Sequence, residues 1–411
     1  MVELSQSEFD TQPTPFDYNL VFKCMAQSRA PGSVESAMNL YGEMLSFASD
    51  DDQAARPDVV SLNTILNISS RHERAHQTEK LLWKFFDRHL QDPSRNPCPD
   101  TISFCTVMQS WSRARDRDAP ERAGKLFDKL EKLYQAGNEN CKPDLFCYSI
   151  LMNCWVRAIK HRKEAPMRVE SLLRRLQEMA RNGNRDLAPD AACWNLAISA
   201  WLGDGERAEA LFMEMLDNSR NNPSAPAPND KTLTKVFHAW AKTRFGGASD
   251  RSVALLDKVK KLHKEGALRV KPHMICHSLV LEALSQDRRL SSAILAEEML
   301  RDMIASRDPA MRPSITCYNW VIKAWSFAAH PEAVSRVTTL LEEVIRASQK
   351  NVKMIPNAKT FGGVLKTLAE SNLPDKKIRA DAVVALMDKL GCQPDRYIQN
   401  VLNDFVTGNT D

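Results

Sequence analysis

The sequence predicts an all-α protein, a right-handed α-solenoid of helix-turn-helix repeats with a concave groove. Three observations lead to this expectation. Proline recurs every 38 to 46 residues, at positions 13, 57, 99, 143, 189, 228, 272, 313, 356 and 394. Apolar residues follow each proline at fixed offsets, and a second helical pattern completes each interval. Hairpins of this kind bury a continuous core only when they stack on one another.

The first helix of each repeat is predicted from its apolar phasing. Large, mostly apolar side chains lie 5, 8, 9 and 12 residues after the proline, and these offsets share one face of a helix. Five of the eight tryptophans occupy the last offset, namely Trp111, Trp155, Trp201, Trp240 and Trp325. We expect these aromatic side chains to pack between helices rather than to stack on a ligand.

The second helix of each repeat is predicted from amphipathic runs such as those at 121–130, 168–179, 206–216, 333–344 and 379–390. Stretches 92–99 and 218–228 are rich in turn-forming residues and are expected to be loops between repeats. We therefore expect nine repeats over residues 13–395, with a capping helix and tail over 396–411. Residues 1–12 are expected to be a disordered segment.

Composition and charge exclude several classes. With 411 residues, 43% hydrophobic and 26% charged, the chain has the composition of an ordinary soluble protein. No apolar run approaches the roughly 18 residues of a membrane-spanning helix. Residues 1–58 carry 3 basic and 10 acidic side chains, against 53 and 42 in the remainder. A basic body with an acidic end is compatible with binding a polyanion, and also with an ordinary solvated surface.

Catalytic and metal-binding motifs are absent from the sequence. It has no Walker loop, no G-x-S-x-G and no H-E-x-x-H, so no enzyme, no cofactor and no small-molecule substrate is predicted. The ten cysteines form no C-x-x-C pair, and no metal site is predicted. Cys147, Cys193, Cys276 and Cys317 take a repeat position that elsewhere holds Ser or Thr. We expect small packed residues in a reducing compartment rather than a disulfide scaffold.

The repeat pattern resembles the pentatricopeptide repeat family. The resemblance rests on CWNLAISAW (193–201), CYNWVIKAW (317–325), SLNTILN (61–67), AEALFMEM (208–215) and Pro-Asp pairs at 57–58, 99–100, 143–144, 189–190 and 394–395. It covers about 390 of 411 residues. The family's repeat has about 35 residues, so these repeats are interpreted as long variants. The tetratricopeptide pattern fits poorly.

The resemblance implies that the protein binds single-stranded RNA, with about one base per repeat read by two side chains. Carried over by position, these recognition pairs are Asn19 with Asp58, Asn63 with Asp100, Cys105 with Asp144, Ser149 with Asp190, Asn195 with Asn229, Thr234 with His273, Ser278 with Ser314, Asn319 with Asn357, and Gly362 with Asp395. The family's tendencies imply U at the first two pairs, G at the fourth and C at the fifth and eighth. The other four pairs depart from the common combinations or have no assignment.

Two further sets of residues have both a functional and a structural interpretation. The residue two after the cap commonly wedges between bases in the resembled family, which here selects Val60, Ile102, Phe146, Ala192, Lys231, Ile275, Thr316 and Lys359. The second set, Arg71, Arg113, Arg157 and Lys242, shares one offset and could contact phosphates. Its alternative role is to stabilise helix C-termini. Likewise, the Asp, Asn or Ser that follows eight of the ten phased prolines is a preferred helix N-cap.

We therefore expect a sequence-selective RNA-binding protein that acts in RNA processing, stability or translation. The alternative is a protein-binding scaffold or ribonucleoprotein assembly subunit with the same fold and no base readout. Protein partners would bind the convex face, and no membrane partner is expected. The resemblance implies a mitochondrion or plastid, although residues 1–17 do not resemble a transit peptide. The chain is expected to be cytosolic, to lack its targeting segment or to be a fragment.

Overall fold

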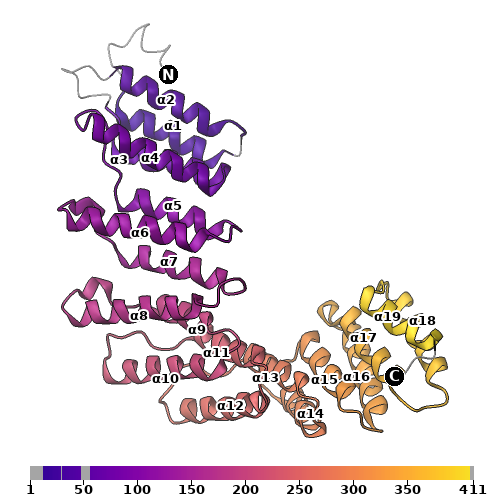
Figure 1. The fold of residues 1–411 in the computed structure, drawn as a ribbon. Coiled ribbons are helices and arrows are strands. Elements are labelled where there is room, and N and C mark those ends of the chain that lie inside the picture. Colours follow the sequence, from indigo (N-terminus) through magenta and orange to yellow (C-terminus); the bar gives the residue numbers. More distant parts are fainter. Residues whose placement is uncertain (1–12, 29, 48–55, 408–411) are drawn as a thin grey trace. The chain divides into compact units, whose positions relative to one another are not determined.

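The computed structural model describes residues 13–28, 30–47 and 56–407, and these residues form α-helices and short 3₁₀ helices without any strand (Figure 1). The prediction of an all-α protein is confirmed. The chain forms two compact units, with the boundary between Ala200 and Trp201. The segment 1–12, expected to be disordered, lies outside the described residues. No helix in the described part is both long enough and apolar enough to cross a membrane.

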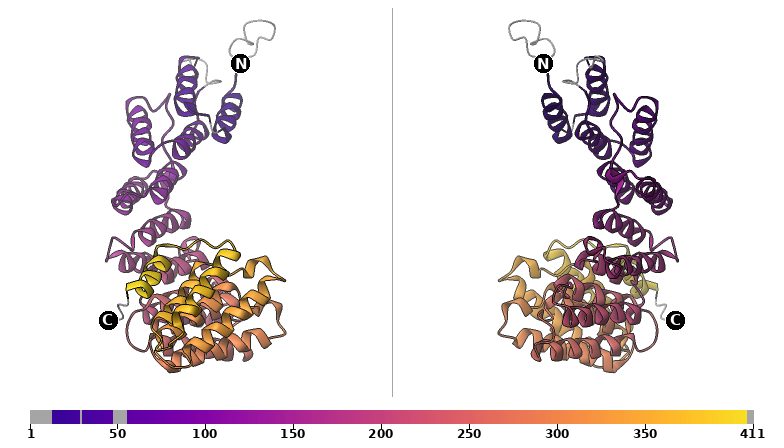
Figure 2. Two further views of the ribbon diagram at one scale, coloured as in Figure 1. Left: turned by 90° about the vertical axis from the view of Figure 1, so that its right-hand side faces the viewer. Right: turned by 90° about the vertical axis from the view of Figure 1, so that its left-hand side faces the viewer.

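The first unit contains nine of the described helices. They are α1 (Pro15–Gln27), α2 (Ser33–Phe47), α3 (Val59–His72), α4 (Ala75–Gln91), α5 (Thr101–Arg113), α6 (Ala119–Gln135), α7 (Leu145–Ala158), α8 (Ala165–Arg181) and α9 (Ala191–Ala200). Short 3₁₀ turns, η2 (Glu139–Cys141) and η3 (Arg185–Leu187), precede α7 and α9. The side-on views show these helices stacked one after another (Figure 2).

The second unit is built in the same way. Its helices are α10 (Gly205–Asn221), α11 (Asp230–Lys242), α12 (Ala248–Lys264), α13 (Met274–Gln286), α14 (Leu290–Ala305), α15 (Ile315–Phe327), α16 (Ala333–Ser348), α17 (Ala358–Ala369), α18 (Lys376–Lys389) and α19 (Arg396–Thr407). The turns η4 (Pro309–Met311) and η5 (Val352–Met354) precede α15 and α17. The last helix, α19, falls where a capping helix was expected.

Every odd-numbered helix begins two residues after one of the phased prolines, and we call these the A helices. Within each unit, successive A helices pack on one another, for example α3 on α5 and α13 on α15. The even-numbered helices pack on the A helices, as α4 does on α5 and α14 on α15. The neighbour-to-neighbour packing is that of a helical repeat.

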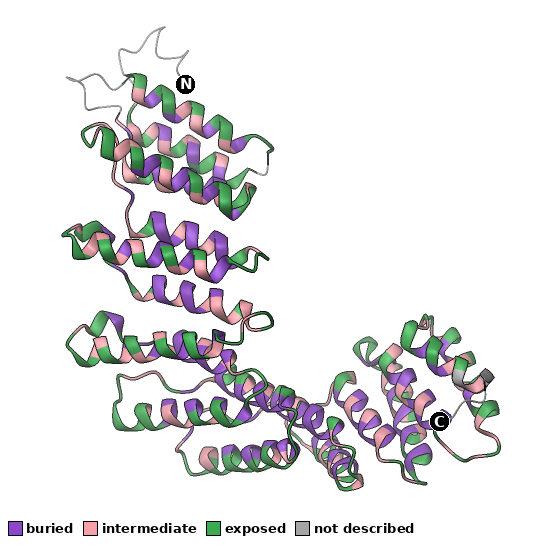
Figure 3. Cartoon of the chain, in the orientation of Figure 1, coloured by how far each residue is buried: buried purple, intermediate pink, exposed green. Residues whose placement is uncertain are grey.

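The core lies along the A helices, where buried residues are concentrated (Figure 3). The phased apolar positions are completely buried in repeats from both units, as in Leu62, Ile65, Leu66, Phe104, Val107, Met108, Phe361, Val364 and Leu365. Trp111, Trp240 and Trp325 are also buried, as expected of core residues. Trp155 and Trp201 are only half-buried. The burial of one helix face fixes the rotation of each A helix and so decides which residues it leaves accessible.

Candidate nucleic-acid interface

The second member of each predicted recognition pair is the N-cap of the next A helix. Seven of these side chains accept a hydrogen bond from the backbone amide three residues further on. The bonds are Asp58 with Ser61 (2.7 Å), Asp100 with Ser103 (2.9 Å), Asp144 with Cys147 (2.9 Å), Asp190 with Cys193 (2.9 Å), Asn229 with Thr232 (3.1 Å), Asn357 with Thr360 (3.3 Å) and Asp395 with Ile398 (2.9 Å). Capping is therefore confirmed at these positions. Ser314 occupies the N-cap of α15 as predicted, but its side chain forms no capping hydrogen bond.

The first recognition pair is joined directly by hydrogen bonds. Asn19 Nδ2 on α1 donates to both carboxylate oxygens of Asp58, at 3.2 Å each. Ser61 Oγ in the first turn of α3 donates to Asn19 Oδ1 at 2.7 Å. The asparagine amide is therefore held by two groups of the next A helix, and its orientation is fixed before any ligand binds.

Two more junctions repeat this arrangement, and we call all three the Asn–cap–hydroxyl triads. In the first unit, Asn63 Nδ2 donates to Asp100 Oδ1 (3.1 Å) and Ser103 Oγ donates to Asn63 Oδ1 (2.6 Å). In the second unit the corresponding contacts are Asn319 with Asn357 (3.3 Å) and Thr360 with Asn319 (2.7 Å). The structure therefore brings three predicted pairs together and adds a hydroxyl residue that the sequence did not single out for this role.

The triads leave part of their hydrogen-bonding capacity unused. In the second triad, the second Nδ2 hydrogen of Asn63 and acceptor sites on the Asp100 carboxylate remain for a ligand. Asn19, Asp58, Asn63 and Asp100 are half-buried, so one edge of each pair stays accessible. In the third triad Asn319 is buried, whereas Asn357 is exposed. The Asn63–Asp100 junction can therefore offer both a donor and an acceptor to one flat polar group such as a base edge.

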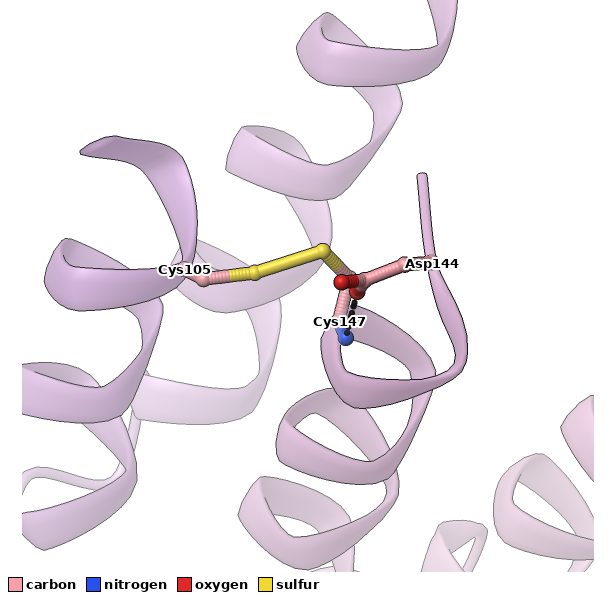
Figure 4. Close-up of side chains that lie close together, drawn as sticks. All are labelled: Cys105, Asp144 and Cys147. Atoms are coloured by element: carbon pink, nitrogen blue, oxygen red, sulfur yellow. Dashed lines mark hydrogen bonds between the residues drawn. A yellow bond between two sulfur atoms is a disulfide. The ribbon is translucent and has the colours of Figure 1, made fainter. Parts of the chain in front are cut away.

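The third predicted pair has different chemistry. Cys105 on α5 and Cys147 on α7 form a disulfide, and Asp144 lies beside them as the cap of α7 (Figure 4). Both side chains are buried, but the expectation that the cysteines form no disulfide is wrong for this pair. They occupy the positions of the asparagine and the hydroxyl in the triads, so two residues that touch across a junction are both replaced by cysteine.

The other pairs are not joined by hydrogen bonds in the described residues. Ser149 Oγ donates to the Phe146 carbonyl of its own helix (2.8 Å), and Thr234 Oγ1 donates to the Asp230 carbonyl (2.8 Å). Their short side chains do not reach Asp190 and His273. Ser278 and Gly362 are buried, and a Cβ at Gly362 would lie 3.1 Å from the Tyr397 ring. Asn195 belongs to the first unit and Asn229 to the second.

An exposed apolar row accompanies the recognition pairs. The predicted wedge residues Val60, Ile102, Phe146 and Ile275 expose 57%, 60%, 54% and 45% of their surface in the first turns of their A helices. Ala192, Lys231, Thr316 and Lys359 are exposed as well. Sequence reasoning missed Phe16 and Tyr397, which are 75% and 50% exposed. Both lie three residues after a phased proline, so the repeat offset could have identified them.

The four predicted phosphate contacts divide into different roles. Arg71 donates to the Ala26 carbonyl (3.0 Å) and Arg157 to the Ser112 carbonyl (3.1 Å), each near the end of the preceding A helix. These two residues therefore stabilise helix C-termini, the structural role expected as the alternative. Lys242 forms an ion pair with Glu282. Arg113 is exposed and has no hydrogen bond or ion pair in the part of the chain that the structure describes.

Comparisons with known proteins add no family assignment. No protein-family model matches the sequence, and no curated protein matches it. The resemblance to pentatricopeptide repeats stays a prediction that rests on the repeated residues themselves.

Proposed function

We propose that the protein binds single-stranded RNA along the N-terminal ends of its A helices, with one base at each recognition pair. In this proposal the nine predicted hairpins form a right-handed solenoid of the pentatricopeptide type. The bound transcript is protected, processed or translated in an organelle because the protein occupies it. No reaction on the RNA is proposed.

One observation carries the proposal, namely the exposed apolar row beside the polar pairs. A large apolar side chain left in water loses its burial free energy, about 1.5–3 kcal/mol for a residue of this size. Isolated cases are common, but Val60, Ile102, Phe146 and Ile275 recur at one position of the repeat. Bases present flat apolar faces and polar edges, so they can stack on these side chains while the pairs contact their edges.

The Asn–cap–hydroxyl triads explain how such contacts would be selective. Asn63 is fixed by Asp100 and Ser103, so its remaining donor points in one direction without loss of side-chain entropy on binding. A carboxylate cap offers only acceptors, whereas an amide cap such as Asn357 offers donors as well. A change of cap from amide to carboxylate therefore alters which base edge fits.

The test is selection of RNA from a random pool, followed by sequencing, with the wild-type protein and the Asn357→Asp variant. We expect a preferred base at one fixed position to change from C toward U, because the pair becomes Asn319 with aspartate. Asn351→Asp is the matched control, since Asn351 caps η5 outside the pairs. An unchanged preference at every position in Asn357→Asp contradicts the assigned pairing, and absence of any selected RNA contradicts RNA binding.

A second function, a protein-binding scaffold, is favoured by a specific observation. Three of the four predicted phosphate contacts already bind protein groups, through Arg71, Arg157 and Lys242. The apolar row would then contact a partner's side chains. The double variant Val60→Ser, Ile102→Ser separates the two functions. Loss of RNA affinity supports the RNA proposal, and unchanged RNA affinity with loss of a co-purifying protein supports the scaffold.

A further inference from the structure

A second polar site lies at the opposite end of the A helices in the second unit. An open cavity of about 820 Å³ is bordered by the turn between α11 and α12 and by the C-terminal ends of α13 and α15. Its lining includes Arg244, Phe245, Asp287, Arg288, Lys323 and Phe327. Helix α13 has 13 residues, so the cavity lies about 20 Å along the helix from the recognition pairs. A strand bound at the pairs would not fill it.

The cavity holds more positive charge than its acidic groups neutralise. Asp287 is bonded to Arg289 through Oδ2, with Nε at 2.8 Å. The charge of Glu282 raises the pKa of Lys323, but Glu282 is already paired with Lys242. In the described residues, Arg244, Arg288 and Lys323 form no ion pair. Three cations on different structural elements therefore face one space without their own counterions.

Two of these cations, Arg288 and Lys323, lie around a single aromatic ring together with Lys366, which is paired with Glu370. Arg288 lies 5.5 Å from the centre of the Phe327 ring, Lys323 lies 5.9 Å from it, and Lys366 lies 3.5 Å from it. The ring face attracts each cation, but the cations repel one another. Partial burial lowers the pKa of Lys323, and the neighbouring Lys242 and Lys366 lower it further. Partial burial and Arg288 likewise lower the pKa of Lys366, whereas its partner Glu370 raises it. An anion in the cavity would relieve this repulsion.

We propose that this cavity binds a phosphate-bearing small molecule, with its phosphate groups between Arg244, Arg288 and Lys323. Phosphate suits these residues because a planar guanidinium binds its oxygens in pairs and an ammonium binds them as a compact charge. The volume is within the range of small-molecule sites. Phe245, which is 48% exposed, and Phe327 provide apolar surface for the remainder of the ligand. The site is independent of the proposed RNA function.

The experiment is isothermal titration calorimetry of the full chain with inorganic pyrophosphate at low ionic strength. We expect a sub-millimolar dissociation constant in the wild type, and at least tenfold weaker binding in both Arg288→Gln and Lys323→Met. The methionine keeps the apolar stem on Phe327 and removes only the charge. Lys264→Met is the matched control, since Lys264 is an exposed residue of α12 outside the cavity. Thermal unfolding without ligand verifies that each variant is folded.

Three results would overturn the proposal. Absence of binding heat in the wild type would show that the cavity does not bind pyrophosphate. An equal loss of affinity in Lys264→Met would show only a general response to charge. Displacement of pyrophosphate by an equimolar amount of single-stranded RNA of uniform sequence would make the cavity a part of an RNA path. Failure of RNA selection with intact pyrophosphate binding would reject the proposed function and leave this site standing.

Discussion

Two adjacent junctions of the first unit use the same positions for different chemistry. Between α3 and α5, Asn63, Asp100 and Ser103 form a hydrogen-bonded triad. Between α5 and α7, the corresponding cysteines form a disulfide next to Asp144. Asp100 and Asp144 cap the following helix in the same way. In each, carboxylate Oδ1 accepts a hydrogen bond from the backbone amide nitrogen three residues further on, at 2.9 Å. The cap therefore fixes the geometry of a junction, and the residues beside it can vary without altering the fold.

Reduction of the disulfide should change the stability of these junctions more than any other change proposed below. Cys105 and Cys147 are 42 residues apart, and closing a loop of that length stabilises by about 4 kcal/mol in the chain-entropy account. We expect reductant to lower the free energy of unfolding of the first unit by up to that amount. Denaturant unfolding followed by circular dichroism measures it, and mass spectrometry confirms the gain of two hydrogens.

The matched control replaces both cysteines with the residues of the neighbouring junction, Cys105→Asn and Cys147→Ser. This variant should form the triad with Asp144, and its stability should not respond to reductant. If the wild type unfolds at the same denaturant concentration with and without reductant, the covalent link does not stabilise this junction.

Removal of a triad should be the next largest effect. Asn63→Ala removes the hydrogen bonds with Asp100 and Ser103 and leaves the capping bond intact. We expect a loss of about 2 kcal/mol in unfolding free energy, because the buried Ser103 hydroxyl and the half-buried Asp100 carboxylate each lose a partner. The control is Ser149→Ala at the corresponding position of another repeat, where the hydroxyl bonds only within its helix. Its loss should stay below about 0.5 kcal/mol, and equal losses would show that the triad adds nothing.

The capping geometry could be predicted from sequence because it depends on neighbours in the chain. Proline followed by Asp58 or Asp100 fixes the start of α3 and α5, and the apolar offsets fix the buried face. The disulfide could not be predicted, since Cys105 and Cys147 meet only after two helices pack. The bond from Arg71 to Ala26 likewise joins residues 45 positions apart. Contacts between repeats therefore need the structure.

The stability of the contacts around Asp287, which follows the C-terminal end of α13, should depend on pH. Partial burial raises the pKa of Asp287, but hydrogen bonds from Arg289, Ser249 and Ser292 outweigh it and lower the pKa to about 2. The lowered pKa means that the stabilisation is present above about pH 4 and is lost as pH falls toward 2. Solvent screens this accessible group, so its contribution at pH 7 is about 1 kcal/mol.

Asp287→Asn tests this dependence when denaturant unfolding of the variant and the wild type is compared at pH 7, 4 and 2. The difference in unfolding free energy should be about 1 kcal/mol at pH 7 and should disappear near pH 2. Asp186→Asn, at an exposed position in η3, is the control and should show little difference at any of these pH values. A difference that does not change with pH would assign the effect to packing rather than to the carboxylate's charge.

The smallest expected effect separates two arginines at one repeat position. Arg71 binds the Ala26 carbonyl, whereas Arg113 is exposed on α5 without such a bond. Arg71→Met should lower unfolding free energy by about 1 kcal/mol, and Arg113→Met should change it by less than about 0.5 kcal/mol. If the chain binds RNA, Arg113→Met should reduce the salt dependence of RNA affinity more than Arg71→Met does. The reason is that a free guanidinium can bind a phosphate and release its counterions. Equal salt dependence of RNA affinity for the two variants would show that Arg113 does not contact the RNA phosphates. Equal unfolding free energies would show that the bond from Arg71 does not stabilise the junction.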